Sequence, residues 1–306
     1  MQNLRVISPA DRTSDVLRML DDTAGVATVS VMRDASVTPA GDVVDVLLAR
    51  ECTDAVIADL RRLGLTHQGA IALTSVETVL ADAAREAEKR APGEPDDAIV
   101  WDELIARTRE ESSLNATFLA FLTIACLLSA IGVVLDSPVT IVGAMVVGPE
   151  FGPLAALAVG LVRRRGSMIR RSLLALTVGF PLAMVVTALG ALAAEAVGWV
   201  RPDSIDDLQQ VDFIYQVGPF SLVVALLAGA AGMLALVSSK SAALVGVFIS
   251  VTTVPAAGFA VVAATVGSWR IAVLSAGQLG SNLVGIVVAA SIVLLLHRRS
   301  RRLRVN

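Results

Sequence analysis

The sequence predicts an α-helical integral membrane protein with a small α+β domain ahead of six transmembrane helices. Hydrophobic residues make up 55% of the 306-residue chain, above the roughly 45–50% of an average soluble domain. The mean hydropathy is +0.72. Charged residues crowd positions 1–113 and become sparse after residue 114. This shift in composition predicts a soluble part followed by a membrane part.

The soluble part has the alternating pattern of a small mixed domain. Strands are predicted at 4–8, 26–33, 42–49 and 69–75, and helices at 10–22 and 54–63. The resulting order, β-α-β-β-α-β, is that of a ferredoxin-like domain, which we assign to residues 1–76. We expect this domain to be cytoplasmic. Because the fold serves many unrelated functions, its topology assigns no activity.

Residues 77–113 are predicted to form a helical linker between the domain and the membrane. An Ala- and Glu-rich helix is expected at 76–91, and a second helix from Ile99 to about Ser113. Between them, residues 91–97 read APGEPDD, a helix-breaking segment. The segment is either a hinge or a passive linker.

Six apolar runs follow within the transmembrane domain, residues 114–297. They lie at 114–135, 138–162, 172–198, 219–238, 242–266 and 271–296. Each is long enough for the roughly 20 residues with which a helix crosses a bilayer. Helices are expected because lipid cannot satisfy open backbone groups. Residues 298–306 form a basic tail.

The Lys and Arg residues near the spans predict the orientation. Thirteen fall on one side and only Arg201 and Arg270 on the other. The positive-inside rule then places both termini in the cytoplasm of a multi-pass cell-membrane protein. Arginines between the second and third spans are topology signals first and candidate ligands for anionic lipid head groups second. These are Arg163, Arg164, Arg165, Arg170 and Arg171.

A set of small and proline residues in the membrane half resembles a known family. The set consists of Asp136, Ser137, Val142 to Met145, Pro149 and Pro153, and later Leu244-Val245-Gly246, Pro255 and Asn282. It is similar to the bacterial and archaeal membrane proteins called domain of unknown function 389. The chain departs from the family at 254–258, where members often have two adjacent prolines and this sequence reads VPAAG. The resemblance implies a membrane fold and no reaction.

Two stretches of the membrane half also resemble each other. Residues 141–160 and 244–263 each have a Val-Gly pair, a proline nine or ten residues later, and then small residues. Each lies in the second span of a set of three. Three-helix repeats must face opposite ways in one membrane, so the pattern predicts a 3+3 inverted repeat, common in transporters. Chance similarity of short apolar segments is the alternative.

Glu150 is the most informative single residue. About twelve residues of helix at 1.5 Å each place it roughly 18 Å from Pro138, near the bilayer midplane. It lies between Pro149 and the Gly152-Pro153 pair, which predicts a helix break at 148–153. The functional interpretation is that Glu150 carries a proton or binds a cation. The alternative is a buried structural carboxyl.

Other polar residues fall on the later spans. Gln278, Ser281 and Asn282 share one face of the last span and could line a pathway opposite Glu150. Bonding between helices is the competing interpretation. Thr252 and Thr253, ahead of Pro255, are weaker candidates because Thr often bonds its own helix. A second break is predicted at 252–258.

The sequence lacks the motifs of soluble enzymes. It contains no HExxH, GxSxG or Walker motif. The two cysteines, Cys52 and Cys126, lie one in each half and give no disulfide framework. We therefore expect no enzyme activity, no cofactor, no metal site and no nucleic-acid partner. The expected partners are the bilayer, further copies of the chain packed through glycine-rich faces, and an unknown small solute or ion.

Two functions remain open from the sequence. The leading hypothesis is a transporter or channel whose pathway passes 148–153 and 252–258. The rival is a membrane-anchored sensor or scaffold whose cytoplasmic domain binds a ligand or partner. A third reading, an enzyme acting on lipid, has no identified substrate.

Overall fold

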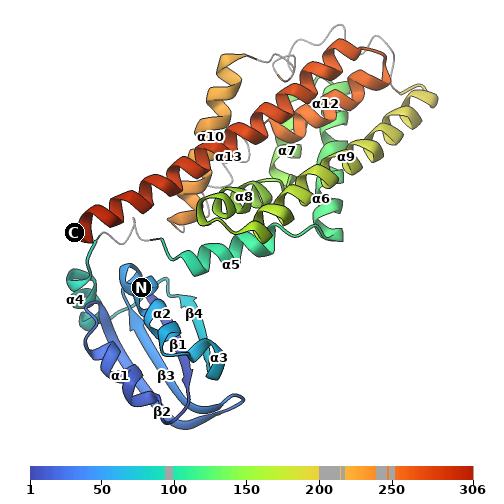
Figure 1. Cartoon of the computed structure of the whole chain (residues 1–306). Helices are drawn as coiled ribbons and strands as arrows, with labels where there is room; N and C mark the ends of the chain where they lie inside the picture. The colour runs from blue at the N-terminus through green and yellow to red at the C-terminus, as the bar shows by residue number, and fades with distance from the viewer. Residues whose placement is uncertain (94–98, 200–213, 215–217, 239–246, 248–251, 306) are drawn as a thin grey trace. The chain divides into compact units, whose positions relative to one another are not determined.

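The computed structural model describes residues 1–93, 99–199, 214, 218–238, 247 and 252–305, with side chains to residue 298. It divides into two compact units, Met1–Leu104 and Ile105–Asn306 (Figure 1). Part of the predicted breaker, most of the connection at 198–218, Leu244-Val245-Gly246 and the side chains of the basic tail beyond Arg298 lie outside the described residues.

The first unit is built on a four-stranded antiparallel sheet. Its strands are β1 (Gln2–Ser8), β2 (Val26–Val37), β3 (Ala40–Leu48) and β4 (Ala70–Ser75), in the spatial order β2-β3-β1-β4. The helices are α1 (Thr13–Asp21), α2 (Thr53–Arg62) and the short α3 (Leu65–Gln68), with a 3-10 turn, η1 (Arg50–Cys52). The predicted order of strands and helices is therefore found, with α3 added before β4.

Alternation along the strands explains where the core of this unit lies. Leu4 and Val6 of β1 and Val44 and Val46 of β3 are fully buried, because every second side chain of a strand points to the same face. The apolar faces of α1 and α2 cover this face, with Leu20 and Leu60 among the buried contacts. β2 runs past its predicted end at 33 because the hairpin resumes pairing across Ser36 and Gly41 after a bulge.

Asp42 holds this bulge in place. Its carboxylate accepts hydrogen bonds from the backbone N–H of Asp34 at 2.9 Å and from Arg33 at 2.6 Å. The Asp34 N–H first, and Arg33 with it, lower the pKa of Asp42. A lowered pKa in the folded state means that Asp42 stabilises the fold above its unfolded pKa of about 3.9, and that this contribution is lost as the pH falls through the folded value.

We therefore predict that Asp42→Asn destabilises the β2–β3 hairpin at neutral pH, and that this effect shrinks as the pH falls below about 3.9. Hydrogen exchange of the peptide covering 26–48, compared between wild type and variant at each pH, measures this difference. A difference that stays constant from pH 7 to pH 3 would contradict the prediction.

Two helices follow in the linker region. α4 spans Asp82–Arg90 and α5 spans Trp101–Glu111. The helix predicted from residue 76 begins six residues later. The β-branched Val76, Thr78 and Val79 ahead of it have low helix propensity.

The second unit consists of apolar helices. They are α6 (Ala116–Val134), α7 (Pro138–Val147), α8 (Phe151–Arg163), α9 (Gly166–Ala196), α10 (Pro219–Val237), α12 (Thr253–Thr265) and α13 (Trp269–Val305). Among the described residues, α6, α9, α10 and α13 are long and apolar enough to cross a membrane. The pair α7 and α8, bent by 51°, makes a fifth candidate span. The fifth predicted span, 242–266, appears only as the 13-residue α12, because most of its first half lies outside the described residues.

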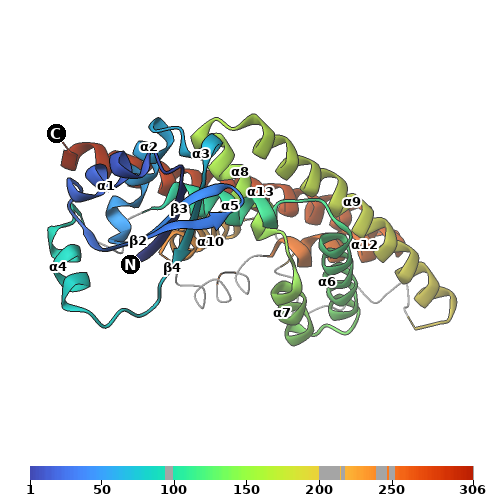
Figure 2. The same ribbon diagram turned by 90° about the horizontal axis from the view of Figure 1, so that it is seen from below.

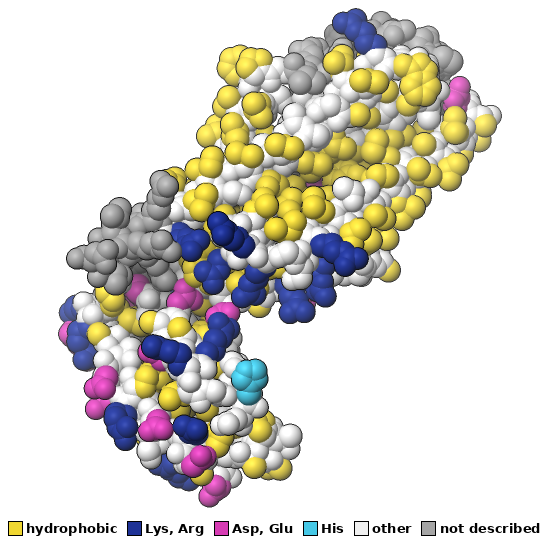
Figure 3. All heavy atoms as spheres, viewed as in Figure 1, with side chains coloured by type: hydrophobic (Ala, Val, Ile, Leu, Met, Phe, Trp, Pro, Cys, Tyr) yellow, Lys and Arg dark blue, Asp and Glu magenta, His cyan; other side chains and the backbone are white. Residues whose placement is uncertain are grey.

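The surface of this unit suits lipid. Large apolar side chains such as Leu182, Val185 and Leu189 of α9 are exposed, and hydrophobic side chains spread over the visible face (Figure 3). Soluble proteins rarely expose apolar surface on this scale. With several apolar helices of spanning length, the chain has the character of a multi-pass membrane protein.

The interior is occupied by the two short helices, α8 and α12. Nearly all residues of α8 and the first eleven of α12 are buried, as expected of helices that are apolar all round. α8 contacts α9 and α13, whereas α12 contacts α6, α9 and α13. α7 lies beside α6 in both views (Figures 1 and 2), with Ile141 against Gly132.

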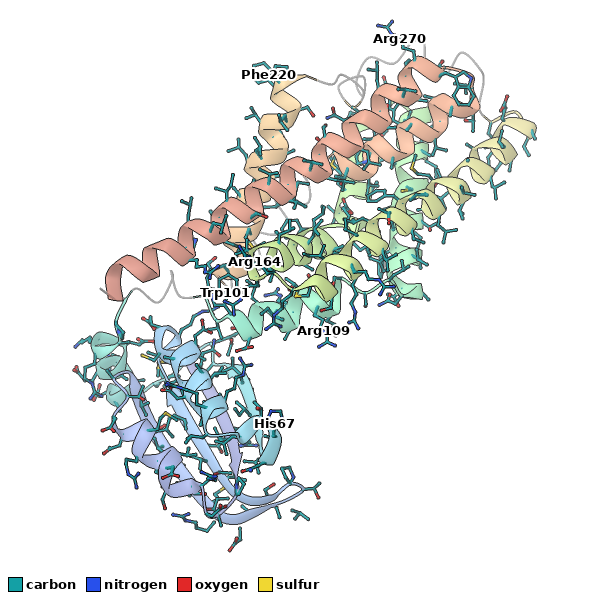
Figure 4. The ribbon with its side chains drawn as sticks, in the orientation of Figure 1. His67, Trp101, Arg109, Arg164, Phe220 and Arg270 are labelled. Carbon is teal, nitrogen blue, oxygen red and sulfur yellow. The ribbon has the colours of Figure 1, made fainter. Side chains whose placement is uncertain are left out.

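Arginines separate along the helical unit. Arg109 and Arg164 lie at one end and Arg270 at the other (Figure 4). The five arginines Arg163, Arg164, Arg165, Arg170 and Arg171 are all exposed. Arg163 ends α8, and the other four lie in the connection to α9 or in the first two turns of α9.

Candidate functional site at the helix breaks

The helix break predicted at 148–153 is found, and it lies at 148–150. α7 ends at Val147, Gly148 is extended (φ −63°, ψ 126°), and Glu150 is the N-cap of α8. Pro149 explains the break because a proline disfavours helical geometry at the residue before it. Gly152 and Pro153 lie inside α8 instead. Proline is tolerated there because N–H groups in a first turn have no helical acceptor.

α12 begins in the same way. Thr252 is its N-cap, Thr253 its first residue and Pro255 its third. Pro153 holds the same third position in α8, and both helices are 13 residues long. The predicted break at 252–258 thus ends at Thr252, and whether a helix precedes it concerns residues outside the described part of the chain.

A hydrogen bond joins the two helix starts. Thr253 Oγ1 donates to Glu150 Oε1 at 2.5 Å. Both residues are buried, with Glu150 6% exposed and Thr253 fully enclosed. Beside them, Asn282 Nδ2 of α13 donates to Thr252 Oγ1 at 2.9 Å. Residues far apart in the sequence therefore meet at one polar centre inside an apolar bundle.

Polar atoms of this centre lack partners. Glu150 Oε2 and Asn282 Oδ1 are buried and have no hydrogen-bond partner within the described residues. Whichever way the Asn282 amide is turned, one of its polar atoms stays unpaired. Buried polar groups are normally hydrogen-bonded, and an unpaired one costs about 1–3 kcal/mol. An unpaired carboxylate oxygen is a site for a proton, a cation or a hydrogen-bond donor.

Gly148 leaves room for the carboxylate of Glu150. A Cβ at this position would lie 2.3 Å from Glu150 Oε2 and 2.9 Å from Val254 Cγ2. Only a glycine lets the carboxyl group fold back over the end of α7. The side chain of Glu150 is thus held between Gly148 on one side and Thr253 on the other.

Gln278 and Ser281 are not part of this centre. Gln278 donates to Ser221 of α10, and Ser281 Oγ donates to the Gln278 carbonyl oxygen within its own helix. Gln278 Oε1 is nevertheless buried without a partner among the described residues. Of the polar face predicted on the last span, only Asn282 has a described hydrogen bond at the helix starts.

Sequence reasoning missed Ser129. Its hydroxyl donates to the Pro255 carbonyl oxygen at 3.3 Å, and it packs against the Cα of Gly258. Both contacts bind α6 to the first two turns of α12. A lone serine in an apolar span was the available signal, and nothing in the local sequence distinguishes it from a serine that bonds its own helix.

The Thr253 hydroxyl gives a testable stability effect. Thr253→Val keeps the shape and removes the donor to Glu150, so we expect a loss of about 1–3 kcal/mol, the cost of an unsatisfied buried acceptor. Thr253→Ser keeps the hydroxyl and should retain most of the stability that Thr253→Val loses. Unfolding of the purified protein in mixed detergent micelles with increasing dodecyl sulfate measures both. A loss for Thr253→Ser with none for Thr253→Val would show that the methyl group matters and the hydrogen bond does not.

The helical unit matches a known family model. The family described as Domain of unknown function (DUF389) matches residues 145–288, which include Glu150, Thr252, Thr253 and Asn282. The resemblance found in the sequence is thus confirmed. No curated protein and no solved structure matches the chain.

Proposed function

We propose that this chain, whose residues 145–288 belong to the DUF389 family, is a transporter or channel for a small solute or ion. The hydrogen bond from Thr253 to Glu150 carries this proposal. It joins the starts of two short buried helices and leaves one carboxylate oxygen unpaired. Ionisable groups deep in membrane helices are costly and mark ion or substrate pathways. Transporters place such sites at interrupted helices.

In this proposal six spans form a 3+3 inverted repeat. The first half is α6, the broken span α7–α8, and α9. The second is α10, the span that ends with α12, and α13. Reciprocal packing supports this symmetry, because α8 contacts the long helix α13 and α12 contacts the long helix α9. Likewise Gly232 of α10 faces Phe151 of α8, and Gly258 of α12 faces Ser129 of α6.

The N-terminal unit would regulate the pathway. Its strand order, β2-β3-β1-β4, supports a ferredoxin-like domain, and the 91–113 connection would transmit its state. The arginines at one end of the helical unit favour cytoplasmic termini in the cell membrane. Gly229, whose Cα packs on Ile286 of α13, serves packing within one chain. Homo-oligomer contacts would use other faces.

Flux into liposomes tests the function. The purified full-length protein is reconstituted, and uptake of a panel of inorganic ions, amino acids and organic acids is compared with protein-free liposomes and with Glu150→Gln. Uptake of at least one compound by wild type, lost in the variant, is the expected result. No uptake of any compound by either protein would contradict the proposal.

The rival function gives the opposite pattern. A membrane-anchored sensor or scaffold would tolerate Glu150→Gln and lose its activity when residues 1–90 are deleted. A transporter with a regulatory domain should still move its substrate without residues 1–90, with altered regulation. The same liposomes, prepared with the truncated chain, separate these two functions.

A further inference from the structure

A cavity lies on one side of the helix break. Its volume is about 480 Å³, which gives room for several water molecules. Its lining combines polar residues of α5 and of the turn into α6 with residues of the break and with aromatic rings. The lining includes Arg107, Glu110, Glu111, Gly148, Pro149 and Gly152.

Glu111 is held against the break. A Cβ on Gly152 would lie 2.7 Å from Glu111 Cβ, 3.0 Å from its backbone oxygen and 3.3 Å from Oε2. The end of α5 can approach the first turn of α8 this closely only because residue 152 has no side chain. Glu111 therefore brings a second carboxylate against Gly152, which is two residues after Glu150 in the chain.

Glu150 lies behind the part of the cavity wall that the helix break forms. Its unpaired oxygen, Oε2, rests on Gly148, and Gly148 itself lines the cavity. No side chain at position 148 separates this oxygen from the cavity. Glu150 itself is buried, with a relative exposure of 6%, and the cavity reaches the glycine on which its carboxyl group rests.

The charges around the cavity favour a cation. Glu110 and Glu111 contribute two carboxylates, and Arg107 contributes one positive charge, at 3.7 Å from Glu111. Burial raises the pKa of Glu111 above its ordinary value, and the neighbouring Arg107 opposes this rise. Among the described residues no cluster of His, Cys, Asp and Glu suits a metal ion. A proton, in contrast to a metal ion, needs only one acceptor oxygen, so a proton is the cation that we consider for this cavity.

We propose that the cavity between α5 and the helix break is the entrance through which protons reach Glu150, with Glu111 as the carboxyl group that receives them. A proton from water binds the Glu111 carboxylate, which releases Arg107. It then passes through cavity water to Oε2 of Glu150, and Glu111 pairs with Arg107 again. This inference rests on the proposed transport function and names its coupling ion.

Proton flux tests the entrance. Liposomes that contain a trapped pH-sensitive dye receive the full-length protein, an imposed pH gradient, and potassium with valinomycin to hold the membrane potential at zero. Glu111→Gln should slow the initial pH change by about a hundredfold, the lower end of what a positioned proton-transfer group contributes. Glu195→Gln is the matched control. It removes a carboxylate in the last turn of α9, a residue that is not among those lining the cavity, and should stay within about twofold of wild type.

Each other outcome overturns the entrance. A wild-type rate of proton flux in Glu111→Gln would show that Glu111 does not receive the protons. Equal losses of flux in both variants would show that removal of any negative charge slows the flux. Proton flux that requires sodium, measured after replacement by N-methyl-D-glucamine, would assign the cavity to sodium. Solute flux that depends on Glu150 but moves no protons would overturn the entrance and leave the transport function intact. Absence of all flux would contradict the transport function as well.

Discussion

Replacing Glu150 by glutamine should abolish flux and leave the protein folded. Glutamine has the same length, and its amide oxygen can still accept the hydrogen bond from Thr253. It cannot bind and release a proton, and it has no charge to balance a cation. The loss should reach about a hundredfold or more if Glu150 takes part in each transport cycle.

The control for this experiment is Glu195→Gln. Glu195 lies in the last turn of α9 and is partly exposed, so the variant removes one negative charge away from the helix starts. It should transport like wild type. Both variants should elute as single peaks from a sizing column and unfold at similar dodecyl sulfate concentrations. Full flux in Glu150→Gln would show that the carboxyl group is structural and would favour the sensor or scaffold.

The sequence predicts the features that depend on local pattern. In the first unit, apolar and polar residues alternate along each strand because one face of the sheet is buried. This alternation predicts the strands and their order along the chain. Pro149 predicts the position of the helix break, because a proline disfavours helical geometry at the residue before it. The equivalent position of Pro255 predicts that α12 starts in the same way. Glu150 stands out in the sequence because a deep carboxylate is costly in an apolar span. Thr252 and Thr253 stand out by their position ahead of Pro255.

Contacts between distant segments could not be predicted in this way. Gln278 and Asn282 share a helix face, yet one pairs with Ser221 and the other with Thr252. The hydrogen-bond partner of each residue depends on which neighbouring helix lies opposite its turn of α13. In the sequence, Glu111 is one of several charged residues near the end of the predicted linker. Its position against Gly152 follows from the path of α5, which no periodicity in the sequence encodes.

Gly148→Ala should reduce flux by displacing the carboxyl group of Glu150. The added methyl group would lie 2.3 Å from Glu150 Oε2 and 2.9 Å from Val254 Cγ2, so one of the two must move. The carboxyl group is the freer end, and its displacement should break the hydrogen bond with Thr253. Gly148 has φ −63° and ψ 126°, a conformation that alanine adopts readily. The effect therefore comes from contact rather than backbone strain.

The expected result is a loss of flux of about tenfold or more and a destabilisation of about 1–3 kcal/mol, typical of an extra methyl group in a packed interior. Gly143→Ala is the matched control. It makes the same substitution on the same helix, where a Cβ would have no neighbour within 4 Å, and it should stabilise the helix by up to about 1 kcal/mol.

A second substitution distinguishes displacement of the carboxyl group from general damage. In Gly148→Ala with Glu150→Asp, the shorter side chain withdraws its oxygens from the new methyl group while keeping the charge. If the position of Oε2 over residue 148 is what transport requires, the double variant should recover part of the flux that Gly148→Ala loses. Additive losses in the double variant, or wild-type flux in Gly148→Ala alone, would show that the carboxyl group works without this contact.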